Sequence, residues 1–182
     1  MPGAAMLSPS RIITEVLELV GRRSEQGRET HVLLLGPPSG ESIETFSAAG
    51  AHVTVEGEDR LTPPLAYPDE SFDLILASDV LDMLDDDEAR ELSREWRRIL
   101  RPGGRVFLLV RRGTGRTIPR FRLDVARDGR LRLTPVPGSS SASRPRSNRE
   151  IDSLMRPMRV DEIYLRRDGL REVAVKRQPR PG

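Results

Sequence analysis

The chain has 182 residues, of which 36% are hydrophobic and 32% charged, and it contains no cysteine. This length corresponds to a single domain over residues 1–182 that is long enough to bury a core. Without cysteine, the chain can form neither a disulfide nor a thiolate metal site. No apolar run approaches the roughly 20 residues that cross a bilayer, and residues 1–7 lack the pattern of a secretory signal. We therefore expect a soluble, cytoplasmic protein.

The formal charge of +2 hides an uneven distribution along the chain. Residues 1–100 hold 9 basic and 20 acidic side chains, whereas residues 101–182 hold 21 basic and 8 acidic ones. A basic region can bind the phosphates of a nucleic acid. Every basic residue except Lys176 is an arginine, which is more typical of compositional bias than of recognition. A solvated basic surface is the preferred interpretation, and nucleic-acid binding is the alternative.

Helices and strands alternate over the first part of the chain. Residues 8–23 place apolar side chains on a helical stripe that Ser8 or Ser10 could cap. The continuous apolar run at residues 31–35 is typical of a strand buried on both faces, as in parallel sheets. Further strands are expected at residues 51–56, 72–77 and 105–110, and further helices at residues 42–49 and 86–100. This order predicts an α/β doubly wound, Rossmann-like sheet that is mostly parallel.

The last part of the chain is expected to contain two antiparallel hairpins. Their turns are Arg127-Asp128-Gly129 and Asp168-Gly169, and alternating sequences flank each turn. The strands are expected at residues 121–125, 130–134, 159–166 and 170–176. Between the hairpins, residues 137–147 are of low complexity and are expected to form a mobile loop. A short helix with Asn148 as its cap should follow, and residues 178–182 should fray.

The loop at residues 36–40, Gly-Pro-Pro-Ser-Gly, joins the first buried strand to the next helix. A tight turn at the carboxyl end of a parallel strand brings backbone close to a ligand, and the helix N-terminus adds a partial positive charge. Glu56 ends the next strand, 20 positions after Gly36. A carboxylate there can accept hydrogen bonds from the two hydroxyls of a ribose. A solvated strand end is the alternative interpretation of Glu56.

Two further motifs resemble those of the class I S-adenosylmethionine-dependent methyltransferases, particularly the type that acts on small molecules. They are Pro-Asp-Glu-Ser-Phe-Asp at residues 68–73 and Leu-Arg-Pro-Gly-Gly at residues 100–104. The resemblance spans about residues 31–110. It implies a seven-stranded sheet in the order 3-2-1-4-5-7-6 with the last strand antiparallel. It also implies S-adenosylmethionine as the cofactor.

The resemblance assigns roles to residues at the carboxyl ends of the strands. The loop residues Gly36, Pro38 and Gly40 would surround the methionine part of the cofactor, and Glu56 would hold its ribose. Ala77, Ser78 and Asp79 would lie beside the sulfonium and the acceptor. Asp79 is the candidate general base, although positioning alone can supply much of the rate of methyl transfer. A helix cap is the alternative role for Asp79.

Three features depart from the family pattern. Pro38 stands where the family has its central loop glycine, and Leu34 stands where an acidic residue is common. Only residues 57–64 separate Glu56 from Leu65, which leaves no room for the family's third strand and its helix. The sequence therefore predicts a trimmed methyltransferase-like domain without this edge strand. Residues 8–111 would be the cofactor-fold core, residues 112–147 a variable, acceptor-facing segment, and residues 148–177 a final helix and hairpin.

The function expected from these features is methyl transfer from S-adenosylmethionine to a small-molecule acceptor. An alternative is a methyltransferase-like fold without catalysis that serves as an interaction or regulatory module with a protein partner. Nucleic-acid binding by the basic part of the chain is the third possibility. No metal site is expected, since the acids at residues 85–88 suit the dipole at a helix start, and neither His31 nor His52 has a partner at ligand spacing.

Overall fold

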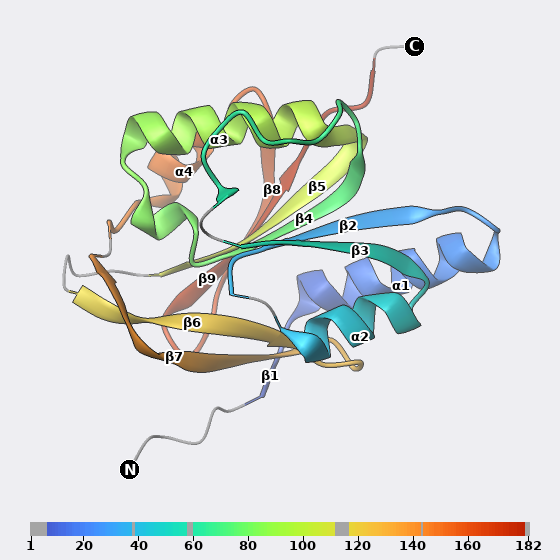
Figure 1. Ribbon diagram of the computed structural model, residues 1–182, viewed down its shortest axis with the longest axis horizontal. Helices are drawn as coiled ribbons and strands as arrows, with labels where there is room; N and C mark the ends of the chain where they lie inside the picture. The colour runs from blue at the N-terminus through green and yellow to red at the C-terminus, as the bar shows by residue number, and fades with distance from the viewer. Residues whose placement is uncertain (1–6, 38, 58–59, 112–116, 143, 181–182) are drawn as a thin grey trace.

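The computed structural model of the protein describes residues 7–37, 39–57, 60–111, 117–142 and 144–180. Its main sheet has the strand order β3-β2-β4-β5-β9-β8 (Figure 1). The first four strands in this order are parallel, and β9 and β8 are each antiparallel to the preceding strand. The strands are β2 (Thr30–Leu35), β3 (Ala51–Glu56), β4 (Phe72–Ser78), β5 (Leu100–Arg111), β8 (Arg159–Leu165) and β9 (Leu170–Lys176).

Helices cover both faces of the main sheet, one pair on each face (Figure 1). The first pair is α1 (Arg11–Glu25) and α2 (Gly40–Ala48), and the second is α3 (Asp86–Ile99) and α4 (Asn148–Met155). Successive strand residues point to opposite faces, so Leu33 joins the core with α3 while Val32 and Leu34 join the core with α1. Burial on both faces explains the continuous apolar runs. The predicted α/β fold is confirmed.

The edge of the main sheet is formed by β3, as predicted from the short connection after Glu56. Among the described residues, no strand lies between β3 and β4 in sequence. The segment that connects them folds back over the core instead, and Leu61 and Leu65 are buried there together with Leu35 and Ala77. The predicted absence of the third family strand is thereby confirmed.

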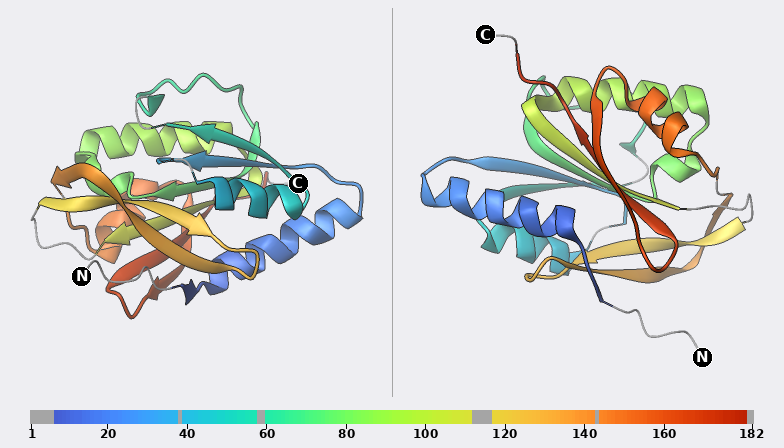
Figure 2. Two further views of the ribbon diagram at one scale, coloured as in Figure 1. Left: turned by 60° about the horizontal axis from the view of Figure 1, so that its bottom comes forward. Right: turned by 180° about the vertical axis from the view of Figure 1, so that it is seen from behind.

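A second, smaller sheet has the order β1-β7-β6 and lies beside α2 (Figure 2). Its strands are β1 (Ser8–Pro9), β6 (Thr117–Val125) and β7 (Arg130–Ala142), all antiparallel. The prediction of a mobile loop from residue 137 is wrong for residues 137–142, which belong to β7. Ser140 pairs with Pro119 there, so the polar backbone of this low-complexity stretch is held by a partner strand.

Side chains cap the helices near the predicted positions. Ser10 accepts a hydrogen bond from the backbone N–H of Ile13 at 3.1 Å, and Asp85 forms a reciprocal capping box with Glu88. For α4 the cap is Ser147 rather than Asn148, because the Ser147 hydroxyl accepts from the backbone N–H of Glu150. The longest helix, α1, has 15 residues, and within the described parts of the chain no helix is long and apolar enough to cross a membrane.

Candidate functional site

The carboxyl ends of β2, β3 and β4 bring the predicted cofactor residues to one edge of the main sheet. Leu35 lies opposite Glu56 on one side and opposite Ala77 on the other. Gly36 follows directly, with φ at +109°, and its N–H donates to the Glu56 carbonyl at 3.2 Å. A Cβ at this position would lie 3.3 Å from the carbonyl oxygen of Ser78. Both the backbone conformation and the close approach therefore require glycine.

The remaining residues of the predicted loop are less constrained by their backbone conformation and contacts than Gly36 is. Ser39 caps α2, its hydroxyl accepting from the Ser42 N–H at 3.1 Å, and Gly40 is the first residue of the helix. A Cβ on Gly40 would meet no described atom within 4 Å, so no contact in this structure requires glycine there. Pro38 lies outside the described residues. Ala77 is 1% exposed and packs into the core with Leu35.

Glu56 is held by a tyrosine that sequence reasoning did not assign to the site. The Tyr67 hydroxyl donates to the Glu56 carboxylate at 2.5 Å, and the Glu56 side chain is only 13% exposed. Burial and the hydrogen bond to Glu56 together raise the pKa of Tyr67 to about 12. The ring of Tyr67 packs edge-on against Phe72. The carboxylate that the spacing assigned to a ribose is thus engaged by the chain itself.

Ser78 is the last residue of β4, and Asp79 follows it directly. The Ser78 hydroxyl is buried and has no hydrogen-bond partner within the described structure. Asp79 adopts a left-handed backbone conformation with φ at +63°. Its carboxylate accepts two hydrogen bonds from Arg111, at 2.8 and 2.9 Å, and one from the Phe121 N–H at 3.2 Å. To act as a base, Asp79 would first have to release Arg111.

A second buried acid, Asp82, stands next to this ion pair. Its carboxylate accepts from the backbone N–H of Arg111 at 2.8 Å, and its side chain is buried. Burial, assisted by the nearby charge of Asp79, raises the pKa of Asp82 to about 6 against the opposing effect of Arg111. Sequence reasoning missed Asp82, although an acid three positions after Asp79 within an apolar stretch was the available signal.

The hairpin of β6 and β7 covers the edge above Gly36. The Ser39 hydroxyl donates to Asp124 at 2.6 Å, and the Thr45 hydroxyl donates to the Val125 carbonyl at 2.7 Å. Ser42 donates to the Leu123 carbonyl at 3.0 Å and accepts from the Val125 N–H at 2.9 Å. We name these four hydrogen bonds the α2–β6 latch. All of its side-chain partners on α2 are buried.

Asp124 is suited to hold the latch closed because it remains ionised. Burial acts to raise its pKa, but hydrogen bonds from Ser39, Arg122 and Thr134 outweigh burial and leave the pKa below its usual value. The hydrogen bond from Ser39 is therefore assisted by charge, which makes it stronger than a neutral one.

The residues at this edge suit a nucleotide-like cofactor, but the space does not. Gly36 exposes backbone at a close approach, Ser78 offers an unused hydroxyl, and Glu56 stands at the ribose position. The cavity between Gly36, Ser39, Ser78 and Leu123 has a volume of about 20 Å³. That is room for about one water molecule, whereas cofactor pockets measure roughly 300–1,000 Å³. Binding of a cofactor at this edge requires the latch to open.

Comparison with known proteins agrees with this arrangement of strands and loop. Residues 35–108 match the family model described as a methyltransferase domain. Residues 35–108 are thus similar to a methyltransferase domain. The resemblance inferred from the motifs at residues 68–73 and 100–104 is thereby confirmed. A search by sequence among curated proteins found no match.

Two solved structures illustrate the similarity of the fold. One is 1,6-didemethyltoxoflavin-N1-methyltransferase from Burkholderia thailandensis, which is 18% identical, with a TM-score of 0.56 over 92% of this chain and 77% of that chain. It contains 1,6-didemethyltoxoflavin and S-adenosylhomocysteine. The other is an amino pentose methyltransferase from Micromonospora echinaspora with bound S-adenosylmethionine. It is 16% identical, with a TM-score of 0.56 over 92% and 90% of the two chains.

The two motifs that carry the methyltransferase resemblance lie at the other end of the sheet and contact each other. Asp73, which ends the first motif, accepts from Arg101 of the second at 2.7 Å and from the backbone N–H of His31 at 2.8 Å. Arg101 also donates to the Glu70 carbonyl at 3.1 Å. In this chain the motifs join the beginnings of β2, β4 and β5. They support the sheet without lining the candidate site.

Proposed function

We propose that the protein is an S-adenosylmethionine-dependent methyltransferase that acts on a small-molecule acceptor. The match of residues 35–108 to a methyltransferase domain carries the proposal, because this stretch contains Gly36, Glu56, Ser78 and Asp79. When bound, S-adenosylmethionine supplies an electrophilic methyl group on its sulfonium. The two similar solved structures are methyltransferases of 1,6-didemethyltoxoflavin and of an amino pentose, which supports a small acceptor.

In this proposal the backbone at Gly36 and the hydroxyl of Ser78 contact the cofactor, and Glu56 accepts hydrogen bonds from its ribose. Glu56 becomes available when Tyr67 gives up its hydrogen bond. Pro38, Gly40 and Ala77 remain predicted neighbours of the cofactor. Since Asp79 is already paired with Arg111, we assign it to orient that arginine beside the acceptor. Methyl transfer then depends on alignment of the acceptor rather than on removal of a proton by Asp79.

The closed latch has a consequence for affinity. Each hydrogen bond contributes about 0.5–1.5 kcal/mol, so opening four of them costs on the order of 2–6 kcal/mol. If only a small fraction of molecules is open, the apparent affinity for the cofactor falls by that fraction. We therefore expect weaker binding of S-adenosylmethionine than an open cleft would give.

The same closure favours a second candidate function, a methyltransferase fold that does not transfer methyl groups. In that case the hairpin of β6 and β7 is a permanent filling of the cleft, and the fold serves as an interaction or regulatory module. The single observation in its favour is the 20 Å³ cavity above Gly36.

Titration calorimetry of the full chain with S-adenosylmethionine and S-adenosylhomocysteine tests both candidates. The wild type is compared with Asp124→Ala, which removes the charged partner of Ser39, and with Asp128→Ala, a control at the exposed hairpin turn. We expect Asp124→Ala to bind both compounds at least about tenfold more tightly than wild type and Asp128→Ala, equivalent to about 1.4 kcal/mol. Absence of heat at millimolar concentration in all three proteins would reject the methyltransferase and support the second candidate.

A further inference from the structure

A cavity of about 850 Å³ is lined by Arg111, Phe121 and Tyr164 among other residues. It is formed where the turn between β8 and β9 comes beside the hairpin of β6 and β7 and the start of α1 (Figure 2). This volume falls within the range of roughly 300–1,000 Å³ that is typical of small-molecule sites. It therefore has the space that the Gly36 edge lacks.

The walls of this cavity are apolar and aromatic. Two rings line it, Phe121 from β6 and Tyr164 from β8, together with Leu133, Leu165 and Leu170. Leu165 is 61% exposed, which is unusual for a large apolar side chain in this molecule. Water at such walls is displaced favourably by an apolar ligand.

The arginines of the cavity divide into an inner pair and an outer pair. Of the inner pair, Arg111 is neutralised by Asp79, and Arg166 is held by Glu172 at 2.8 Å and by Asp168 at 3.0 Å. Both of these side chains are buried. Three carboxylates thus face these two guanidinium groups, so neither arginine offers an unpaired charge to a ligand.

The outer pair, Arg11 and Arg167, lies where the cavity opens to solvent. The Arg11 side chain is 70% exposed, and it forms an ion pair with Glu15, which is also exposed. Arg11 lies 6.0 Å from the centroid of the Tyr164 ring. Arg167 is exposed and forms no ion pair with any residue that the structure describes. Two cations are thus available at the mouth of an apolar cavity.

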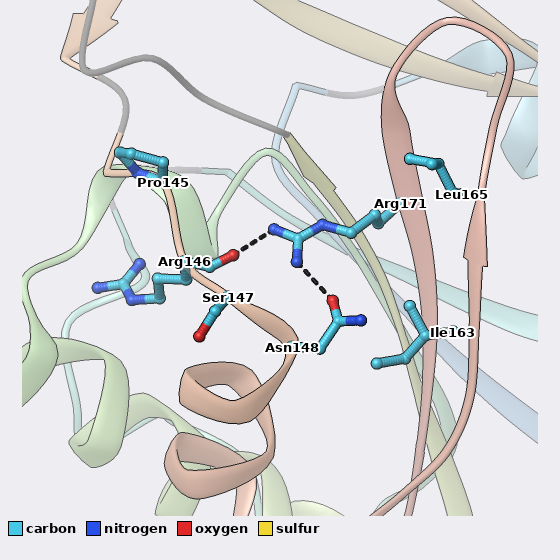
Figure 3. A pocket seen from close by; sticks show the side chains of 7 residues that line it. All are labelled: Pro145, Arg146, Ser147, Asn148, Ile163, Leu165 and Arg171. Carbon is cyan, nitrogen blue, oxygen red and sulfur yellow. Dashed lines mark hydrogen bonds between the residues drawn. The ribbon is translucent and has the colours of Figure 1, made fainter.

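A second cavity, of about 500 Å³, shares Leu165 with the first but offers no such charge (Figure 3). Its cation Arg171 donates to the Asn148 side chain at 2.6 Å and to the Arg146 carbonyl. The other arginine, Arg146, donates to the carbonyls of Leu81 and Leu84. Both cations of the second cavity hold the backbone in place, so the first cavity is the better ligand site.

We propose that the larger cavity binds an apolar organic anion, such as an aromatic carboxylate. Its apolar body lies between Phe121 and Tyr164, and its charge lies at the mouth beside Arg11 and Arg167. A void of about 10 Å³ lined by Ser78, Asp79 and Arg111 adjoins the inner wall of the cavity. The ligand therefore sits next to the candidate methyl-transfer edge. That this ligand is the methyl acceptor rests on the proposed function. That the cavity binds the ligand does not.

Two fluorescent probes with the same aromatic body test this site in the absence of cofactor. One is 8-anilinonaphthalene-1-sulfonate, which is an anion, and the other is N-phenyl-1-naphthylamine, which is uncharged. We expect each probe to bind the folded full chain saturably at one molecule per chain. The double variant Arg11→Gln/Arg167→Gln should weaken binding of the sulfonate about fivefold and leave binding of the neutral probe unchanged.

Two variants serve as comparisons for this measurement. Arg90→Gln/Arg156→Gln removes the same charge from α3 and from the residue that follows α4, and it should change neither affinity. Leu165→Ser changes an exposed position and should not disturb folding. It should weaken the binding of both probes several-fold. The proposal is overturned by equal sulfonate binding in the two arginine variants, by unsaturable binding, or by no binding of either probe. Any of these results leaves the separate cofactor titration to decide the proposed function.

Discussion

At the candidate edge, two neighbouring residues hold left-handed backbone conformations that few side chains allow. Gly36 has φ at +109°, and Asp79, which carries a side chain, has φ at +63°. Aspartate tolerates this region better than most residues because its short polar side chain finds local partners. Here Arg111 and the Phe121 N–H supply them. Of the two glycines predicted in the loop, backbone geometry requires Gly36, whereas Gly40 is not required by any contact in this structure.

Asp82 gives the protein a specific dependence of stability on pH. Its pKa is raised to about 6 in the folded state by burial, compared with a usual value of 3.8. The folded state therefore holds the proton more tightly than the unfolded state does. As pH rises from about 4 through 6, the contribution of this group to the free energy of unfolding falls by about 3 kcal/mol.

The variant Asp82→Asn should remove this fall, because its amide oxygen can still accept from the Arg111 N–H and no longer ionises. Urea unfolding of wild type and variant at intervals between pH 4 and pH 7 measures the difference. Asp152→Asn, at a half-exposed position on α4, should keep the wild-type slope. If Asp82→Asn shows the same fall as wild type, Asp82 does not titrate as the structure indicates.

Among the elements, the hairpin of β6 and β7 determines how open the candidate site is. It belongs to the smaller sheet rather than to the main sheet, and its contacts with α2 close the cleft above Gly36. Ser42 is central to these contacts because one hydroxyl serves both the Leu123 carbonyl and the Val125 N–H. Loss of that hydroxyl leaves two backbone groups of β6 without their partner.

Ser42→Ala should therefore loosen the hairpin locally. A buried backbone group that loses its partner costs about 1–3 kcal/mol, so we expect a destabilisation of about 2 kcal/mol. Hydrogen exchange followed by mass spectrometry should show faster exchange in β6 with little change in β4. Ser47→Ala, at an exposed position on the same helix, provides the control. Equal exchange in the two variants would show that Ser42 does not hold the hairpin.

Elements that depend on local patterns could be predicted from the sequence, and long-range pairings could not. The run at residues 31–35 signals a buried strand by itself, and the spacing from Gly36 to Glu56 places both residues at one edge. By contrast, the strand at residues 137–142 forms only because β6 pairs with it, and its serines carry no strand signal. The closure of the site by Asp124 joins residues 85 positions apart, Ser39 and Asp124. No local pattern contains such a contact.

At the scale of the whole molecule, part of the uneven charge along the chain is paired within the fold. Several ion pairs join the acidic part, residues 1–100, to the basic part, residues 101–182. Examples are Arg101 with Asp73 at 2.7 Å and Arg177 with Glu70 at 3.0 Å. These pairs occupy arginines that a nucleic-acid surface would need. The charge separation in the sequence is thus a property of how the two parts fit together.

The buried pair of Asp79 and Arg111 is the contact between the two parts on which the fold should depend most. Arg111→Met removes the countercharge of a buried carboxylate, and the loss of one partner of such a pair costs about 3–5 kcal/mol. The double variant Asp79→Asn/Arg111→Met should recover at least half of this loss, since asparagine tolerates the left-handed backbone and carries no charge. Arg156→Met, whose ion pair is exposed, should change the free energy of unfolding by about 1 kcal/mol or less. Urea unfolding at pH 7 measures the free energy of unfolding of all three variants. If the Arg111→Met protein is as stable as the Arg156→Met protein, the pair contributes nothing to holding the two parts together.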